Sequence, residues 1–246
     1  MFSTSRPRPG VTVLTIDDGK VNAMGPAFVA TFGKAWEEAT ASGDAVVITG
    51  NAKAFCAGLD LKRLPGLDRA GLLAFTRDFI AVFRQVLGGD RPVVAHVDGP
   101  ALAGGAVLAL CADFRVVGPR AKLGLTEVMV GVPFPAPVAT LAAARLPAPE
   151  HAPTLLDAAI RDGPETCVAH GWAHQVGDLD AAVALAARLA EHPRTAFASA
   201  RHASNDALTA AFAAFDETAI AAWVDVVGSE RVMTEIMAAF ARITAR

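Results

Sequence analysis

One acid stands alone in an apolar segment of the chain. Glu127 lies in the run LGLTEVMVGVPFPAP, and no other Asp or Glu occurs between Asp113 and Glu150. A carboxylate among apolar side chains is paired, protonated or active in proton transfer, because burial without a partner disfavours its charged form. From this segment alone, the favoured interpretation is a structural carboxylate bonded to backbone N–H groups. A catalytic acid–base group is the alternative.

Two glycine turns could bring free backbone N–H groups to the same site. They are Ala57-Gly58-Leu59-Asp60 and Ala103-Gly104-Gly105. Gly58 permits backbone conformations that other residues resist, and the second turn falls where a helix should begin, so its free N–H groups favour an anion. Each turn alone has a structural explanation: Asp60 as a helix N-cap in the first, close helix packing in the second. Together they indicate convergent donors for one oxygen, as in an oxyanion hole.

Strand and helix patterns alternate through the part of the chain that must position these groups. Hydrophobic runs predict strands at 11–16, 45–49, 93–97 and about 114–117, and helical spacing predicts helices at about 26–39, 69–87 and 103–111. This alternation indicates an α/β layered core. After Pro149 the β pattern fades, and Ala-rich segments predict an all-helical last third with helices at 181–190, 195–223 and 230–241. We therefore divide the chain into a core, 1–180, and a helical part, 181–246, which we expect to supply core or subunit-interface residues.

Composition limits the class of protein. The 246 residues are 53% hydrophobic and 19% charged, which is typical of a globular protein with surface left to bury between subunits. A net charge of -3 provides no basic face for nucleic acid. The chain has no apolar stretch of about 18 residues, so we expect a soluble, cytoplasmic protein without a membrane partner. Its three cysteines lack metal-binding spacing, so we expect reduced thiols and no metal site.

The glycine turns and their surroundings resemble the crotonase, or enoyl-CoA hydratase/isomerase, superfamily. Residues 54–61 are similar to the family's AFCAG-x-DL motif, and residues 101–113 to its downstream A-x-GGG-x-x-x-A-x-x-CD motif. Residues 20–24 are similar to a NAL-type turn, and residues 171–176 to a GLV-x-x-VV segment. The resemblance spans most of the chain. It implies stacked β-β-α turns forming a superhelix, with a helical C-terminal part, and assembly into trimers or dimers of trimers.

The resemblance also implies an acyl-CoA thioester as the substrate, with coenzyme A as part of it and no separate cofactor. The backbone N–H groups of Leu59 and Gly104 would hold the thioester oxygen and stabilise an enolate. The chain departs from the family at Ala103, where the family has the first of three glycines. The positions that we expect to contact the substrate are Ala23, Ala57, Gly58, Asp60, Gly105, Val107 and Phe134.

The acids determine the expected reaction. Hydratases of this superfamily use two glutamates, and the first of these positions falls at Val107, which cannot carry a proton or hold water. The second is Glu127. Adding water requires activation of an oxygen and protonation of a carbon, whereas one carboxylate can move a double bond by taking a proton from the α-carbon and returning one to the γ-carbon. Residues 124–134 are similar to the mitochondrial 3,2-enoyl-CoA isomerase branch, whose pattern is GLNE-x-x-LGI followed by Pro-Phe.

The favoured function is therefore 3,2-enoyl-CoA isomerisation with Glu127 as the single acid–base group. A hydratase or another thioester enzyme of the superfamily is the first alternative, and a non-catalytic acyl-CoA-binding protein is the second. Apolar surroundings should raise the pKa of Glu127. We expect His96, Cys56 and Cys111 to be core residues. Lys62 and Arg63 are either surface charges or contacts for the coenzyme A phosphates.

Overall fold

Six strands form the larger of two sheets in the computed structural model, which describes residues 1–41 and 45–244. Strand β1 (Phe2–Arg8) is antiparallel to β2 (Val11–Ile16), and the later neighbours in the sheet are parallel. The remaining strands, in spatial order, are β3 (Ala45–Thr49), β4 (Val93–Val97), β6 (Phe114–Val117) and β9 (Gln175–Val176). The four strands predicted from hydrophobic runs are confirmed.

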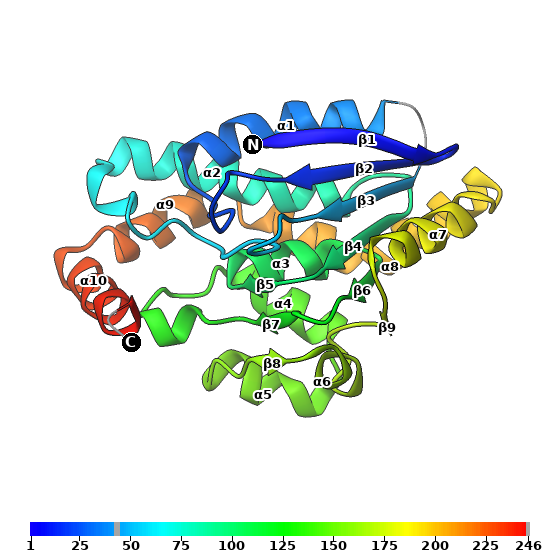
Figure 1. The fold of residues 1–246 in the computed structure, drawn as a ribbon. Coiled ribbons are helices and arrows are strands. Elements are labelled where there is room, and N and C mark those ends of the chain that lie inside the picture. Colours follow the sequence, from blue (N-terminus) through cyan, green and yellow to red (C-terminus); the bar gives the residue numbers. More distant parts are fainter. Residues whose placement is uncertain (42–44, 245–246) are drawn as a thin grey trace.

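A smaller sheet lies beside the larger one (Figure 1). It consists of β5 (Pro100–Leu102), β7 (Lys122–Gly124) and β8 (Arg161–Asp162), with β5 parallel and β8 antiparallel to the central β7. The chain passes from β4 into β5 and from β6 into β7, so successive turns add one strand to each sheet. This stacking builds the superhelix of turns that the sequence predicted.

Helices cover both faces of the larger sheet. Alternate residues of a strand point to opposite faces, and valines of β2, β3 and β4 pack on one face against α7 (Leu179–Ala190). On the other face, Leu14 and Ile48 belong to a core that includes α1 (Pro26–Thr40) and α2 (Arg69–Leu87). Because both faces are buried, β3 and β4 are apolar almost throughout, as parallel strands require.

The other helices follow the predicted pattern in part. The short helix after the second glycine turn is confirmed as α3, and the chain also forms two 3₁₀ helices, η1 and η2. Their bounds are α3 (Gly104–Cys111), α4 (Ala136–Arg145), α5 (Ala148–Leu156), α6 (Pro164–Ala169), α10 (Glu230–Thr244), η1 (Leu64–Gly66) and η2 (Glu127–Val130).

The single helix predicted over 195–223 is wrong. The structure has two helices there, α8 (Arg194–Ala214) and α9 (Glu217–Val227), because Asp216 caps α9 by accepting hydrogen bonds from the N–H groups of its first turn. Arg84 of α2 donates to two carbonyls at the end of α8, which satisfies groups that a continuous helix would have paired. Among the described residues, no single helix is long and apolar enough to cross a membrane, although this bent pair passes together on length and composition.

The prediction of an all-helical last third also needs correction. Strands β8 and β9 fall after Pro149, but each has only two residues, which is too short for an alternating pattern to appear in sequence. Helix α7 begins at Leu179, so it spans residue 180, and it packs on the larger sheet. The division of the chain at residue 180 stays a prediction.

A buried arginine joins the helical part to the core. Arg201 of α8 is 4% exposed, and its guanidinium donates to both carboxylate oxygens of Asp113 at 2.9 Å. It also donates to the backbone carbonyls of Val86 at 2.7 Å and Leu87 at 2.9 Å, at the end of α2, and to that of Gly89. One side chain thus links α8 to α2 and to the start of β6.

Candidate active site

Three segments lie side by side at one edge of the smaller sheet, two of them leaving strands β5 and β7 and the third leaving the bridged residue Cys56. Cys56 forms a parallel bridge with Ala101, and Ala101 of β5 pairs with Leu123 of β7, so these residues lie in one row. Parallel strands that leave such a row end at the same edge of the sheet. Three or four residues beyond the row stand the predicted site residues Leu59, Gly104 and Glu127.

In the first glycine turn, the backbone pairing uses the neighbours of Leu59 and leaves its own N–H unpaired. Leu59 forms a parallel bridge with Met24, in which the N–H of Met24 donates to Gly58 O at 2.7 Å and the N–H of Asp60 donates to Met24 O at 3.2 Å. No described residue accepts a hydrogen bond from Leu59 N–H. Gly58 has φ 83°, a left-handed conformation that favours glycine. The turn therefore presents a free donor.

The second turn begins α3 in direct contact with the first. Gly104 is the first residue of α3, so its N–H precedes the first intrahelical bond, which Val107 N–H makes to Ala103 O at 3.0 Å. A Cβ on Gly58 would lie 2.8 Å from Gly104 N and 2.6 Å from Leu102 O. The two turns therefore meet only because residue 58 has no side chain.

Glycine is also required at position 105, for packing. A Cβ there would lie 1.9 Å from Cys56 O, so α3 approaches the first turn as closely as its backbone allows. The two explanations that the sequence left open for the second turn are therefore compatible. Close helix packing is present, and the same packing sets the free N–H of Gly104 beside the first turn.

Ala103 carries backbone strain at the start of α3. It has φ 48° and ψ -124°, a conformation that residues with a side chain rarely adopt. Its N–H donates to Gly124 O at 2.9 Å, which fixes the turn to the end of β7. The departure from the family's three-glycine run therefore falls at a position where glycine is the unstrained residue.

Glu127 is a buried acid with an unpartnered oxygen. The residue is 7% exposed, and its Oε2 has no hydrogen-bond partner among the described residues. Burial raises the pKa of its carboxyl from its ordinary value of 4.5 to about 7, and a hydrogen bond from its own backbone N–H opposes this rise. The structural alternative, a carboxylate satisfied by several backbone N–H groups, does not match the free Oε2. This acid is poised to exchange a proton near neutral pH.

Gly104 is bordered by two apolar side chains, which the sequence patterns did not indicate. A Cβ on Gly104 would lie 3.1 Å from Phe79 Cζ and 3.2 Å from Met24 Sδ. Met24 is fully buried, whereas Phe79 is half-buried within the aromatic row Phe75, Phe79 and Phe83 of α2. Helical spacing along α2 indicates only a buried face, and contact with the α3 turn depends on the tertiary packing of α2 on α3.

The other predicted positions divide between the surface and the core. Ala23, Ala57 and Asp60 are partly exposed beside the first turn, and the N–H of Ala57 donates to Val21 O at 3.0 Å. Val107 is 1% exposed in α3. Phe134 is half-buried against the core, and its neighbour Pro133 accepts a hydrogen bond from Trp223 Nε1 at 3.0 Å.

The expected core residues are confirmed as buried. His96 Nδ1 lies 3.0 Å from Thr49 Oγ1, and burial raises the pKa of the Cys56 and Cys111 thiols to about 12. Lys62 Nζ lies 5.8 Å from the centroid of the Phe240 ring of α10, so this ammonium has an aromatic contact. Among the described residues, no group of three or more His, Cys, Asp or Glu side chains has a metal-binding arrangement.

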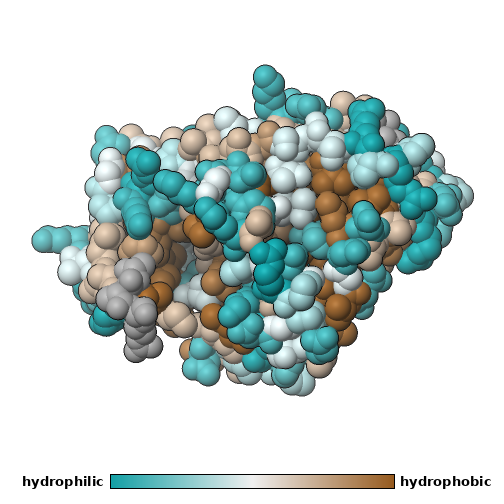
Figure 2. Space-filling model, viewed as in Figure 1, coloured by the Kyte–Doolittle hydropathy of each residue, from teal (hydrophilic) through white to brown (hydrophobic). Residues whose placement is uncertain are grey.

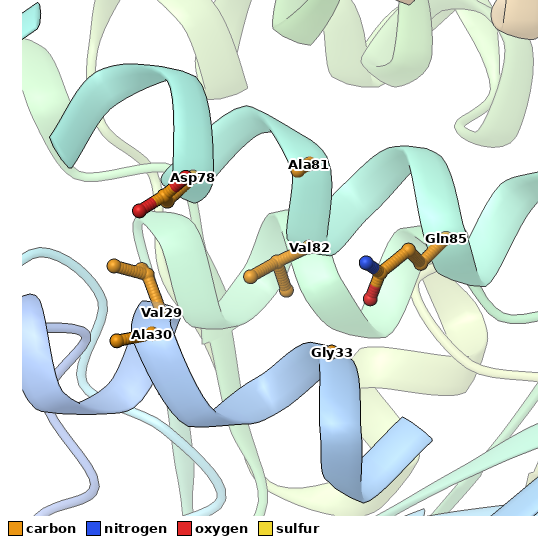
Figure 3. Close-up of a pocket in the computed structure, with 7 residues that line it drawn as sticks. All are labelled: Val29, Ala30, Gly33, Asp78, Ala81, Val82 and Gln85. Atoms are coloured by element: carbon orange, nitrogen blue, oxygen red, sulfur yellow. The ribbon is translucent and has the colours of Figure 1, made fainter. Parts of the chain in front are cut away.

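One face of the molecule is hollowed in the area of helix α10 (Figure 2). Figure 2 shows a hollow beside hydrophobic side chains on the left of the view, in the area where Figure 1 places α10. Helix α10 packs on η2, the segment that begins with Glu127. Two further cavities lie elsewhere, one of about 660 Å³ along α8 and one of about 160 Å³ between α1 and α2 (Figure 3). Neither is lined by Leu59, Gly104 or Glu127.

Comparisons with known proteins agree with this architecture. The family model described as "Enoyl-CoA hydratase/isomerase" matches residues 6–241. A probable enoyl-CoA hydratase of Mycobacterium bovis is 42% identical over 88 residues, which are 36% of this chain and 34% of the relative. Thus the match spans only about a third of the length of that curated relative.

Solved structures extend the similarity to nearly the whole chain. A Mycobacterium tuberculosis protein, described in one structure as an enoyl-CoA isomerase and in another as a probable enoyl-CoA hydratase, is 28% identical with a TM-score of 0.79. These matches cover 93% and 96% of this chain and 98% of each solved chain. Human mitochondrial delta3-delta2-enoyl-CoA isomerase has a TM-score of 0.89 over 99% of this chain and 98% of its own, but at 18% identity this shows the fold alone.

Replacing Ala103 with glycine should stabilise the protein. Ala103→Gly removes the left-handed strain and increases the entropy of the unfolded chain, which leaves a net gain of about 1 kcal/mol in the free energy of unfolding. Urea denaturation with an unchanged slope measures this gain. The matched control is Ala106→Gly, a buried position in the regular part of α3, which should lose about 1 kcal/mol. Equal losses in the two variants would contradict the strain at Ala103.

Because the pKa of Glu127 is raised, its burial should lower the stability of the folded protein only at higher pH. Because the folded protein binds the proton more tightly than the unfolded chain, stability is complete below pH 4.5 and falls as pH rises through 7. Glu127→Gln should therefore match the parent near pH 4 and exceed its stability above pH 7 by up to about 3 kcal/mol. Thermal unfolding across pH measures the difference. The exposed control Glu37→Gln should show no such trend, and an equal trend in both variants would refute the buried site.

Proposed function

The chain belongs to the enoyl-CoA hydratase/isomerase family, and we propose that it binds an acyl-CoA thioester and stabilises its enolate. The observation that carries this proposal is the contact of two turns with unpaired backbone donors, at Leu59 and Gly104, at the same sheet edge as a buried acid. An enolate oxygen carries a full negative charge, and each fixed N–H donor contributes about 3 kcal/mol to its stabilisation. Both donors are part of the backbone, so they need no reorganisation when the charge develops.

Within this family, the residues favour isomerisation of a 3-enoyl-CoA to a 2-enoyl-CoA. Glu127 takes a proton from the α-carbon, and the electrons of that C–H bond form the dienolate held by the two N–H groups. The dienolate then takes the proton from Glu127 at its γ-carbon, so the double bond moves to the 2-position and the carboxylate is regenerated. A pKa of about 7 suits both steps, since the group must accept and return a proton near neutral pH.

A hydratase is the second candidate. The curated relatives matched over part of the chain include enzymes named probable enoyl-CoA hydratase, and one Mycobacterium tuberculosis protein is described both as an isomerase and as a probable hydratase. The names alone therefore do not distinguish the two reactions. The buried Val107 supports isomerisation, because it supplies no acid to activate water. Asp60 is also close to the turn, but its Oδ1 accepts from Lys62 N–H at 3.2 Å and its Oδ2 lies 3.9 Å from Arg63. A non-catalytic acyl-CoA-binding protein is the third candidate.

We also propose that the chain assembles into a homotrimer or a dimer of trimers. Apolar side chains are exposed on η2 and near β8, and burial against another subunit would remove them from water. They are Val128 at 48%, Met129 at 46%, Leu156 at 77% and Ile160 at 38% exposure. A cytoplasmic location and activity without a separate cofactor stay predictions.

Incubation with 3-hexenoyl-CoA in deuterated water tests the three candidate functions together. We expect 2-hexenoyl-CoA with deuterium incorporated, because the carboxylate exchanges its proton with solvent during turnover. 3-Hydroxyhexanoyl-CoA as the main product would favour the hydratase, and binding without exchange would favour the non-catalytic protein.

Glu127→Gln should reduce isomerisation and α-deuterium exchange by at least about 10³-fold while acyl-CoA affinity stays within about tenfold. Undiminished turnover in this variant, with Glu37→Gln as the exposed control, would refute the role of Glu127.

Phe79 should limit branching of the acyl chain close to the thioester, since its ring borders Gly104. Phe79→Ala should raise the ratio of kcat/KM for 2-methyl-3-hexenoyl-CoA to that for 3-hexenoyl-CoA by about tenfold, the usual effect of one methyl group in an apolar pocket. Phe197→Ala is the control, because Phe197 is also half-buried but packs beside α7 on the opposite face of the sheet. An unchanged ratio in Phe79→Ala would place the acyl chain elsewhere.

A further inference from the structure

We propose that Asn22 is a positioning residue that holds the Leu59 N–H in place for the thioester oxygen. This inference rests on the proposed function, since it assigns a role within the same site. Asn22 is fully buried, so its amide must be satisfied inside the protein. Its hydrogen bonds reach the end of β2 and the residues just before the first glycine turn. The relative placement of these two segments sets the direction of the Leu59 N–H.

The side-chain amide of Asn22 binds the segment that leads into the first glycine turn. Its Nδ2 lies 2.9 Å from Ile16 O, 3.0 Å from Ala54 O and 3.1 Å from Phe55 O. Two amide hydrogens serve these three carbonyl oxygens, so one hydrogen is shared. The end of β2 is thereby joined to the chain immediately before Cys56, where the parallel bridge to Ala101 begins.

The carbonyl oxygen of Asn22 completes the network on its other side. Its Oδ1 accepts from the N–H of Asp18 at 3.0 Å and from Asn51 Nδ2 at 3.2 Å, while its own N–H donates to Asp18 Oδ1 at 3.0 Å. Every polar atom of the side chain has a partner. A buried, fully satisfied polar network of this kind allows one arrangement, because any shift leaves a donor or acceptor unpaired.

The backbone of Asn22 turns the chain so that its neighbours pair with the donor turn. Its φ is 56°, a left-handed conformation that asparagine adopts more readily than most residues. On one side of it, Val21 O accepts from Ala57 N–H at 3.0 Å. On the other side, Met24 makes the bridge to Leu59.

This geometry explains why the bridge leaves Leu59 N–H free. Met24 N–H and Met24 O take the groups on either side of Leu59, which holds the peptide plane of Leu59 with its N–H directed away from the pairing. If the segment of Asn22 moved by a fraction of an ångström, that plane would rotate. Catalysis is sensitive to such changes, and a displacement of about 1 Å at a positioned group costs roughly 100-fold in rate.

The test is Asn22→Gly, which permits the left-handed backbone and removes the whole side chain, including the amide. Its readout is the absorption of bound cinnamoyl-CoA, since donors on the thioester oxygen polarise this conjugated probe and shift its band to the red. In the variant we expect a smaller red shift and a kcat for 3-hexenoyl-CoA that is 10- to 100-fold lower, with KM changed less than about threefold. The control is Asn205→Ala, which removes another buried amide, on α8, that donates a hydrogen bond to Leu87 O. This variant should leave the red shift unchanged.

Asn22→Ser, which keeps one donor group, takes the place of the glycine variant if that variant does not fold, and should show a smaller change in the same direction. A folded variant with the parent's red shift and kcat would overturn the role of Asn22 alone. A rise in KM without a change in kcat would also overturn it, because that result indicates substrate binding and not donor placement. A parent protein with neither red shift nor proton exchange would overturn the proposed function, and this inference with it.

Discussion

The close approach of two backbone turns is the constraint on which the site depends. Gly58 and Gly105 have no side chain, and a Cβ at either position would meet backbone atoms of the other turn at 2.8 Å or less. Backbone pairing along the row Cys56, Ala101 and Leu123 sets the register of this approach, and the two glycines permit it. Both sheets and the helices that cover them serve to hold this row in register.

Glu127 illustrates how a candidate catalytic group opposes folding. Burial without a partner for Oε2 costs free energy whenever the carboxyl is ionised, and the same burial brings its pKa close to neutral. A salt bridge would relieve the cost and remove the useful pKa. Among the described residues, the other buried acid, Glu150, is paired with Arg161, and the carboxylate of Asp113 is paired with Arg201. Glu127 differs from both because no cation in the described part of the chain pairs with it.

The sequence predicts those features that local patterns determine. Strands 11–16 and 93–97 are rich in Val, Leu and Ile, and the helix at 69–87 has one apolar face, so each can be predicted without tertiary information. Strands β5 and β7 have three residues each and no alternation, and their pairing depends on the whole fold. Local motifs likewise indicate Leu59, Gly104 and Glu127. The place of Phe79 and the contacts of Asn22 could not be predicted, because they depend on segments that are distant in the sequence.

Arg201 has a consequence for the cooperativity of unfolding. Its guanidinium is buried and bonds to α2 and to the start of β6, so α8 cannot detach without breaking its hydrogen bonds to Asp113 and to three backbone carbonyls. Local opening of α8 therefore disrupts contacts at the end of α2 and at the start of β6 as well. The amide protons at the end of α2 and in the middle of α8 should form one slowly exchanging group, spanning parts of the chain more than a hundred residues apart.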